Sequence, residues 1–132
     1  MTADGPLLTL LRSKVRDVPD FPAPGILFKD IAPLLSDYHA MDAALNLLAL
    51  AIEDLMFDVI AAPEARGFIF AAPLARHFGV GLALIRKPGK LPAATLSHTY
   101  SLEYGNDTLE MHADSFEEMV SPRVLIVDDV LA

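Results

Sequence analysis

Two adjacent aspartates, Asp128 and Asp129, have the side chains best placed for chemistry in this sequence. They directly follow the aliphatic run Val124–Val127, which is typical of a strand buried on both faces in a parallel sheet. In an open α/β sheet, ligands bind just beyond the carboxyl ends of the strands. The sequence therefore predicts that the two carboxylates line a ligand site.

A short loop at residues 64–67 offers a second set of polar groups. It follows a predicted strand, Phe57–Ala62, and precedes a predicted helix, Phe68–Phe78. Free backbone N–H groups and the helix dipole favour an anion at such a position, and Arg66 would add a forked cation. From the residues alone, a surface ion pair explains Arg66 equally well.

A basic loop at residues 86–92 begins where the next predicted strand, Val80–Ile85, ends. Its cations are Arg86, Lys87 and Lys90. Strand, loop, helix and strand form a parallel βαβ unit, so the carboxyl ends of both strands meet at one edge of the sheet. We therefore expect these cations to converge on the edge that carries the aspartates. A solvated basic loop is the alternative.

Two helices and an irregular loop are predicted before this unit. The first helix spans Pro6–Val15, and the second runs from a cap at Ser36 or Asp37 to about Met56. Between them, two prolines and a glycine in Asp20–Asp30 indicate an irregular loop. Its large apolar residues make it either a packed loop or a ligand-facing one.

A β-hairpin or mobile arm is predicted after the basic loop. Thr95–Tyr104 and Thr108–His112 alternate in polarity, and Gly105-Asn106 between them is a hairpin-type turn. We expect this arm to cover the active edge.

The composition limits the class of protein. The chain has 132 residues, 53% of them hydrophobic, and a net charge of −8. Such a balance suits a folded domain and argues against nucleic-acid or anionic-membrane partners, while a few local cations can still hold an anionic small molecule. The absence of cysteine removes disulfides, thiolate nucleophiles and cysteine-based zinc sites. Without a secretory signal or a membrane-length apolar run, we expect a soluble cytoplasmic protein.

Five segments taken together resemble the adenine phosphoribosyltransferases of the type I phosphoribosyltransferase family, in family order and spacing. The segments are 20–31, 64–68, 86–92, 100–105 and 124–132. The resemblance implies an α/β fold: a Rossmann-like parallel sheet with flanking helices. It also implies an N-terminal helix and adenine-binding hood over residues 1–35, a partial core over 36–132 and a flexible lid at about 87–112.

The activity implied by the resemblance is purine salvage. Members transfer 5-phosphoribose from phosphoribosyl pyrophosphate to adenine, giving AMP and pyrophosphate with Mg²⁺, and they form homodimers. The alternative is a non-catalytic phosphoribosyl- or nucleotide-binding regulatory module on the same fold. Leu125–Asp129 alone would also fit the first strand of a signalling receiver, but here this strand closes the chain.

The resemblance also assigns the groups that hold the pyrophosphate. Arg66 and the backbone of Glu64–Ala65, across a cis peptide, would bind it. Lys87 and Lys90 belong to the loop that meets it, and Arg86 is a further substrate-binding residue.

Roles near the ribose and the proton-transfer step follow in the same way. Asp128 and Asp129 would grip the ribose hydroxyls and assist the Mg²⁺ site. Glu103 is the implied catalytic residue, a proton relay to the purine ring, and Tyr104 is part of the lid.

The adenine pocket and the 5′-phosphate cradle complete the implied site. Leu27, Phe28 and Lys29 would form the pocket, and Ala132 would begin the cradle. Family members usually continue with Thr-Gly-Gly-Thr, so we expect this chain to be the front part of a longer enzyme, weakly stable and catalytically poor by itself. Ala62-Pro63 replaces the small, glycine-containing pair usual before Glu64.

Overall fold

The computed structural model describes residues 5–130, which form two units with the boundary in the chain between Glu53 and Asp54. Each unit is described by itself. None of the helices in residues 5–130 has the length and apolarity needed to cross a membrane.

The first unit contains a small antiparallel hairpin between helices. Its elements are α1 (Pro6–Ser13), β1 (Arg16–Pro19), β2 (Leu27–Asp30), α2 (Ala32–Leu35) and α3 (Tyr38–Ile52). Proline stands at the start of α1, as expected for a first helical turn. The Asp37 side chain caps α3 by accepting the Ala40 N–H at 3.1 Å, as predicted.

Several boundaries in this unit differ from the prediction, and the first is that α1 ends at Ser13 and not at Val15. The prediction of an irregular loop over residues 20–30 is wrong for its last four residues, which form β2. Leu27–Asp30 pairs with Arg16–Pro19, and the side chains of Arg16 and Asp30 form an ion pair across the hairpin. The helix expected to reach Met56 ends at Ile52, and Met56 is 73% exposed, so the apolar stripe is not buried that far.

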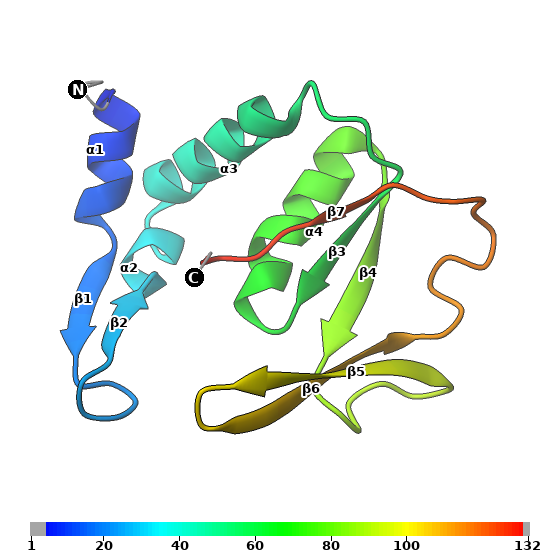
Figure 1. Cartoon of the computed structure of the whole chain (residues 1–132). Helices are drawn as coiled ribbons and strands as arrows, with labels where there is room; N and C mark the ends of the chain where they lie inside the picture. Colours follow the sequence, from blue (N-terminus) through cyan, green and yellow to red (C-terminus); the bar gives the residue numbers. More distant parts are fainter. Residues whose placement is uncertain (1–4, 131–132) are drawn as a thin grey trace. The chain divides into compact units, whose positions relative to one another are not determined.

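The second unit is built on a five-stranded sheet (Figure 1). Its elements are β3 (Val59–Pro63), α4 (Arg66–Phe78), β4 (Gly81–Arg86), β5 (Thr95–Leu102), β6 (Gly105–His112) and β7 (Val124–Ile126). The strand order is β5-β6-β4-β3-β7, and β3 pairs in parallel with both β4 and β7. The predicted βαβ unit is therefore confirmed.

The core of this unit lies where α4 covers β3. Val59–Ala62 is buried throughout, and the apolar side chains Phe70 and Leu74 of α4 are buried as well. At the sheet's edge, β7 is less covered than predicted, because Ile126 is 67% exposed. A run of aliphatic residues does not distinguish a central strand from the last strand of a sheet.

The hairpin of β5 and β6 is also confirmed, but its turn is not where predicted. Leu102 pairs with Gly105, so Glu103 and Tyr104 form the two-residue turn, and Gly105 begins β6 with a φ of 131°. The register of the two strands, rather than the Gly-Asn pair, decides the turn. Only the end of β6 pairs with β4, at Ile85↔Met111 and Arg86↔Glu110.

Candidate active site

The carboxyl ends of β3, β4 and β7 are neighbours, and each carries charged side chains. Glu64 follows β3, Lys87 follows β4, and Asp128 and Asp129 lie beyond β7. Arg66 begins α4, directly after the loop that leaves β3. The convergence predicted from the sequence therefore exists within the second unit.

The first pair in this cluster joins α4 to the end of β7. Arg66 Nε lies 2.7 Å from Asp129 Oδ2, and the Asp129 side chain is only 6% exposed. The two atoms form an ion pair without hydrogen-bond alignment, and within residues 5–130 Asp129 Oδ2 is a buried oxygen that accepts no hydrogen bond. A buried carboxylate oxygen in this state is ready to accept a donor from a ligand.

Asp128 lies beside the first turn of α4. A Cβ added to Gly67 would lie 3.1 Å from Asp128 Oδ1, so any larger residue here would require its neighbours to shift. Asp128 as a whole is exposed, but partial desolvation of its carboxylate is the largest cause that raises the pKa of Asp128 above its usual range. The Asp129 N–H donates to Asp128 Oδ1 at 2.8 Å, which fixes one carboxylate against the next residue.

Glu64 holds the start of the basic loop. Its Oε1 accepts the backbone N–H of Lys87 at 2.6 Å, and its Oε2 lies 3.3 Å from Arg86 Nη2. The Lys87 N–H bond is the main reason that the pKa of Glu64 lies below its usual value. The Glu64–Ala65 peptide is cis, as the family resemblance implied.

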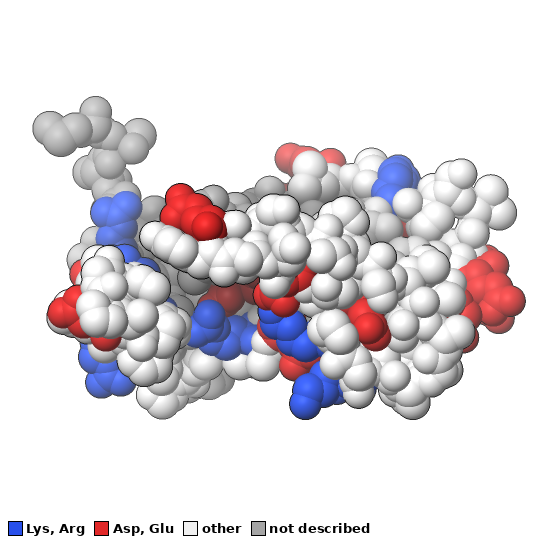
Figure 2. Space-filling model, turned by 60° about the horizontal axis from the view of Figure 1, so that its bottom comes forward, with Lys and Arg blue, Asp and Glu red and all other residues white. Residues whose placement is uncertain are grey.

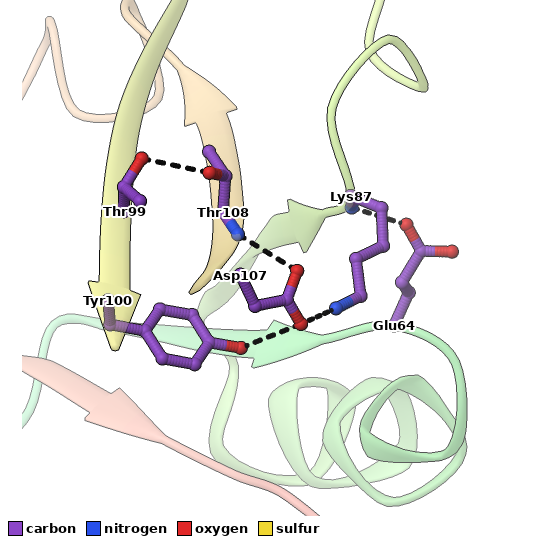
Figure 3. Close-up of polar contacts among 6 residues, drawn as sticks. All are labelled: Glu64, Lys87, Thr99, Tyr100, Asp107 and Thr108. Atoms are coloured by element: carbon purple, nitrogen blue, oxygen red, sulfur yellow. Dashed lines mark hydrogen bonds and ion pairs between the residues drawn. The ribbon is translucent and has the colours of Figure 1, made fainter. Parts of the chain in front are cut away.

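The Lys87 side chain contacts the hairpin (Figure 3). Its ammonium forms an ion pair with Asp107 Oδ2, which also accepts the Tyr100 hydroxyl at 3.1 Å. The Thr108 N–H donates to the other Asp107 oxygen at 2.8 Å. The contact with Lys87 is the largest cause that lowers the pKa of Asp107, and the reverse contact raises the pKa of Lys87.

The far end of the basic loop is tied down as well. His112 Nε2 and the Pro92 carbonyl are 2.6 Å apart, and the Ala113 N–H donates to the Ala94 carbonyl at 2.9 Å. Lys90, between Lys87 and Pro92, is exposed, and its carbonyl accepts a hydrogen bond from Arg86 Nη1 at 3.4 Å. The loop is therefore anchored at both ends, by the Lys87 N–H bond to Glu64 and by the bonds to His112 and Ala113.

Three of the basic side chains at this edge form ion pairs with carboxylates. Arg66 pairs with Asp129, Arg86 with Glu64 and Lys87 with Asp107. Figure 2 likewise shows Lys and Arg side chains lying among Asp and Glu rather than in one basic patch. Cations that are paired in this way do not form the continuous basic surface that binds a nucleic-acid backbone.

A model of the phosphoribosyl transferase domain matches residues 35–132. The adenine phosphoribosyltransferase of Thermoanaerobacter sp. (strain X514) is 56% identical over 122 residues, which cover 92% of this chain and 69% of that protein. The chain belongs to the adenine phosphoribosyltransferase family.

Solved structures of this family agree with the fold. The adenine phosphoribosyltransferase of Thermoanaerobacter pseudethanolicus superposes with a TM-score of 0.90 at 54% identity, covering 95% of this chain and 72% of that one. The Giardia lamblia enzyme, complexed with 9-deazaadenine, gives a TM-score of 0.86 at 33% identity, with 95% and 68% covered. The type I phosphoribosyltransferase fold predicted from the sequence is confirmed, and the comparisons lend no support to the regulatory alternative.

The remaining predicted site residues belong to three other parts of the chain. Glu103 and Tyr104 form the tip of the hairpin, where Tyr104 is 97% exposed. Leu27, Phe28 and Lys29 lie in β2 of the first unit, and Ala132 lies outside the described residues.

Within β2 the three residues have different surroundings. Leu27 is 53% exposed, and the Phe28 ring meets Phe21 edge to face at 5.1 Å. Lys29 forms an ion pair with Asp17. Their place in an adenine pocket remains a prediction.

The sequence reading missed Tyr100, Asp107 and Gly67. Glycine in the first turn of a helix, directly after a cation, was a signal of close approach that could have been used. Asp107 had no local signal, because its partner Lys87 lies in a different strand-end loop, and only the pairing of β6 with β4 brings them together.

Two carboxylates are the chain's own candidates for a metal. Among the described residues no group of three or more His, Cys, Asp or Glu side chains could hold an ion. Mg²⁺ is commonly bound by one or two carboxylates together with substrate phosphates and water. Asp128 and Asp129 fit that mode, and Asp129 Oδ2 is a buried oxygen that accepts no hydrogen bond within residues 5–130.

Proposed function

We propose that this protein transfers the 5-phosphoribosyl group of phosphoribosyl pyrophosphate to adenine, producing AMP and pyrophosphate. One observation carries the proposal: cations and carboxylates converge at the carboxyl ends of β3, β4 and β7 in a chain 56% identical to an adenine phosphoribosyltransferase. The family's reaction needs both kinds of group at one place.

Breaking the bond between ribose C1 and the pyrophosphate oxygen leaves two charges to stabilise. The ribose gains oxocarbenium character, and negative charge grows on the pyrophosphate. Arg66, Arg86, Lys87 and Lys90, with the backbone of Glu64–Ala65, are the proposed pyrophosphate-binding groups. Fixed cations aimed at developing charge lower the barrier without a covalent nucleophile. Arg86 Nε supports this role, since it is a buried donor with no hydrogen-bond partner in residues 5–130.

Asp128 and Asp129 are the proposed ribose and metal ligands. Carboxylates accept hydrogen bonds from the 2- and 3-hydroxyls, and Asp129 Oδ2 is a buried acceptor of the required kind. A bound Mg²⁺ would neutralise pyrophosphate charge at the same position. The two aspartates would hold it, directly or through water.

Adenine contacts are proposed for β2 of the first unit. Leu27 and Phe28 would provide apolar and ring contacts, and Lys29 a polar one. When the purine nitrogen attacks ribose C1 it must lose a proton, and Glu103 is the proposed relay for that proton. Tyr104 would help the lid to exclude water, which competes for the oxocarbenium-like carbon.

The test is AMP formation from adenine, phosphoribosyl pyrophosphate and Mg²⁺, with hypoxanthine and guanine in parallel. This chain would be assayed beside an extended version that continues through the Thr-Gly-Gly-Thr loop of the family. AMP from adenine alone, by either polypeptide, supports the proposal. A nucleotide product from hypoxanthine or guanine instead overturns the specificity, and no product from either polypeptide overturns the activity.

Assembly and location are part of the proposal. We propose a cytoplasmic homodimer, on the basis of the family resemblance. Sedimentation equilibrium tests the dimer: a mass that stays at one chain across micromolar concentrations would contradict it.

A further inference from the structure

We infer that Asp107 is a positioning residue that occupies the Lys87 ammonium until the substrate's pyrophosphate group displaces it. The inference rests on the proposed function, in which Lys87 binds that group. It adds a competitor from the hairpin to the anion site, and it makes the hairpin respond to anion binding.

Asp107 is held in place independently of Lys87. Tyr100 donates to Oδ2 at 3.1 Å, and the Thr108 N–H donates to Oδ1 at 2.8 Å (Figure 3). The hydroxyls of Thr108 and Thr99 are 2.8 Å apart, and this contact joins β5 and β6 next to Asp107. The Asp107 carboxylate therefore keeps two neutral donors when the Lys87 ammonium leaves. Loss of Lys87 does not leave this carboxylate without hydrogen-bond partners.

The Lys87 side chain can move from Asp107 to a bound pyrophosphate while its backbone stays in place. Its backbone is fixed by the 2.6 Å bond to Glu64, while its side chain is 47% exposed and reaches Asp107, which is 31% exposed. A partly exposed pair of single charges is weak. Pyrophosphate carries several negative charges, so it attracts the ammonium more strongly than one carboxylate does.

Displacement has a consequence for the hairpin. Asp107 lies on β6, opposite Tyr100, three residues beyond the Tyr104 turn. The Lys87 contact ties this part of the hairpin to the end of β4. When the anion takes Lys87, the tip that carries Glu103 loses this tie and is freer to move over the site.

The experiment measures the dissociation constant of inorganic pyrophosphate by titration calorimetry at low salt. Asp107→Asn keeps the shape and the Tyr100 contact but removes the competing charge. We expect it to bind pyrophosphate about two- to five-fold more tightly, the range expected from loss of a partly exposed ion pair. Asp107→Glu keeps the charge and should stay closer to the wild type.

Two controls separate positioning from general charge effects. Asp114→Asn changes the net charge equally at an exposed residue that follows β6, and it should leave the affinity near the wild-type value. In a Lys87→Ala background, which should itself bind pyrophosphate more weakly, Asp107→Asn should have no further effect, because the two residues act through one contact.

Hydrogen exchange of the hairpin amides at residues 99–108 gives a second readout. Pyrophosphate should speed exchange in the wild type, whereas Asp107→Asn should already exchange faster and respond less. Unchanged or weaker binding by Asp107→Asn, with Lys87→Ala still impaired, overturns the inference and leaves the proposed function standing. No pyrophosphate binding by the wild type, or no effect of Lys87→Ala, overturns the inference together with the proposed role of Lys87.

Discussion

Gly67 and Asp128 approach each other so closely that a side chain at position 67 would have to displace its neighbours. An added Cβ would lie 3.1 Å from Asp128 Oδ1, 3.1 Å from the Val127 carbonyl and 3.2 Å from Pro63 Cδ. Glycine at position 67 therefore lets the first turn of α4 lie against the end of β7 without displacing these atoms. This close approach sets the distance between the helix N-terminus and the acidic pair.

Gly67→Ala tests that relationship. Alanine normally stabilises a helix interior by about 0.5–1 kcal/mol over glycine. Here the crowded backbone should reverse the sign, and we expect the free energy of unfolding to fall by about 1–3 kcal/mol. Urea unfolding measures the change.

The matched control for Gly67→Ala is Gly81→Ala in β4 of the same unit, where the nearest atom to a new Cβ is 4.0 Å away. It should be tolerated better. If the Gly67 variant is as stable as the wild type, α4 has space to move and the glycine is not required.

Glu103→Gln tests the proposed proton relay. Glutamine keeps the size of the side chain but does not take up a proton, so kcat should fall by about 10²-fold or more. The dissociation constant of pyrophosphate should stay unchanged, since Glu103 lies at the tip of the hairpin and is not one of the proposed pyrophosphate-binding residues. Steady-state kinetics and calorimetry measure the two quantities, with exposed Glu117→Gln as the control. Retained kcat would remove Glu103 from the mechanism.

Glu64 should act through the basic loop. Glu64→Ala removes the acceptors for the Lys87 N–H and for Arg86, so the loop loses its anchor to β3. We expect pyrophosphate to bind about tenfold more weakly, as for loss of one charge-assisted hydrogen bond. Glu64→Gln keeps an acceptor for the Lys87 N–H and should lose less. Equal losses in both variants would show that the charge, and not the backbone anchor, is what counts.

Asp58 and Arg123 should make the second unit sensitive to acid. Arg123 donates to Asp58 through its backbone N–H and its guanidinium, and these bonds lower the Asp58 pKa from 3.8 to about 2. A carboxyl whose pKa is lower in the folded state stabilises that state above pH 3.8. The contribution disappears as the pH falls towards 2.

Thermal melts of the wild type and Asp58→Asn between pH 6 and pH 2 measure this linkage. The wild type should have the higher melting temperature at pH 6, and the difference should shrink through the interval from about 4 to about 2. A difference that is constant over the whole range would show that the pair does not titrate as described. Because Asp58 lies at the start of β3, opposite the candidate active site, the substitution should leave pyrophosphate affinity unchanged.

Local patterns were sufficient for much of this fold. The βαβ unit, the cap at Asp37 and the existence of a hairpin followed from residue periodicity and from turn and capping residues, all of which act over a few positions. The site edge followed too, since parallel strands connected by a helix must end at the same side of the sheet. The sequence by itself therefore placed Arg66, Lys87 and the two aspartates at one edge.

Tertiary structure decided what depends on distant partners. Leu27–Asp30 became a strand because Arg16–Pro19 pairs with it, and the hairpin turn fell at Glu103 because of the register between β5 and β6. The contacts of Lys87 with Asp107 and of Gly67 with Asp128 arise only when separate elements meet. Pairing, register and close packing are properties of two segments at once, and no single stretch of sequence contains them.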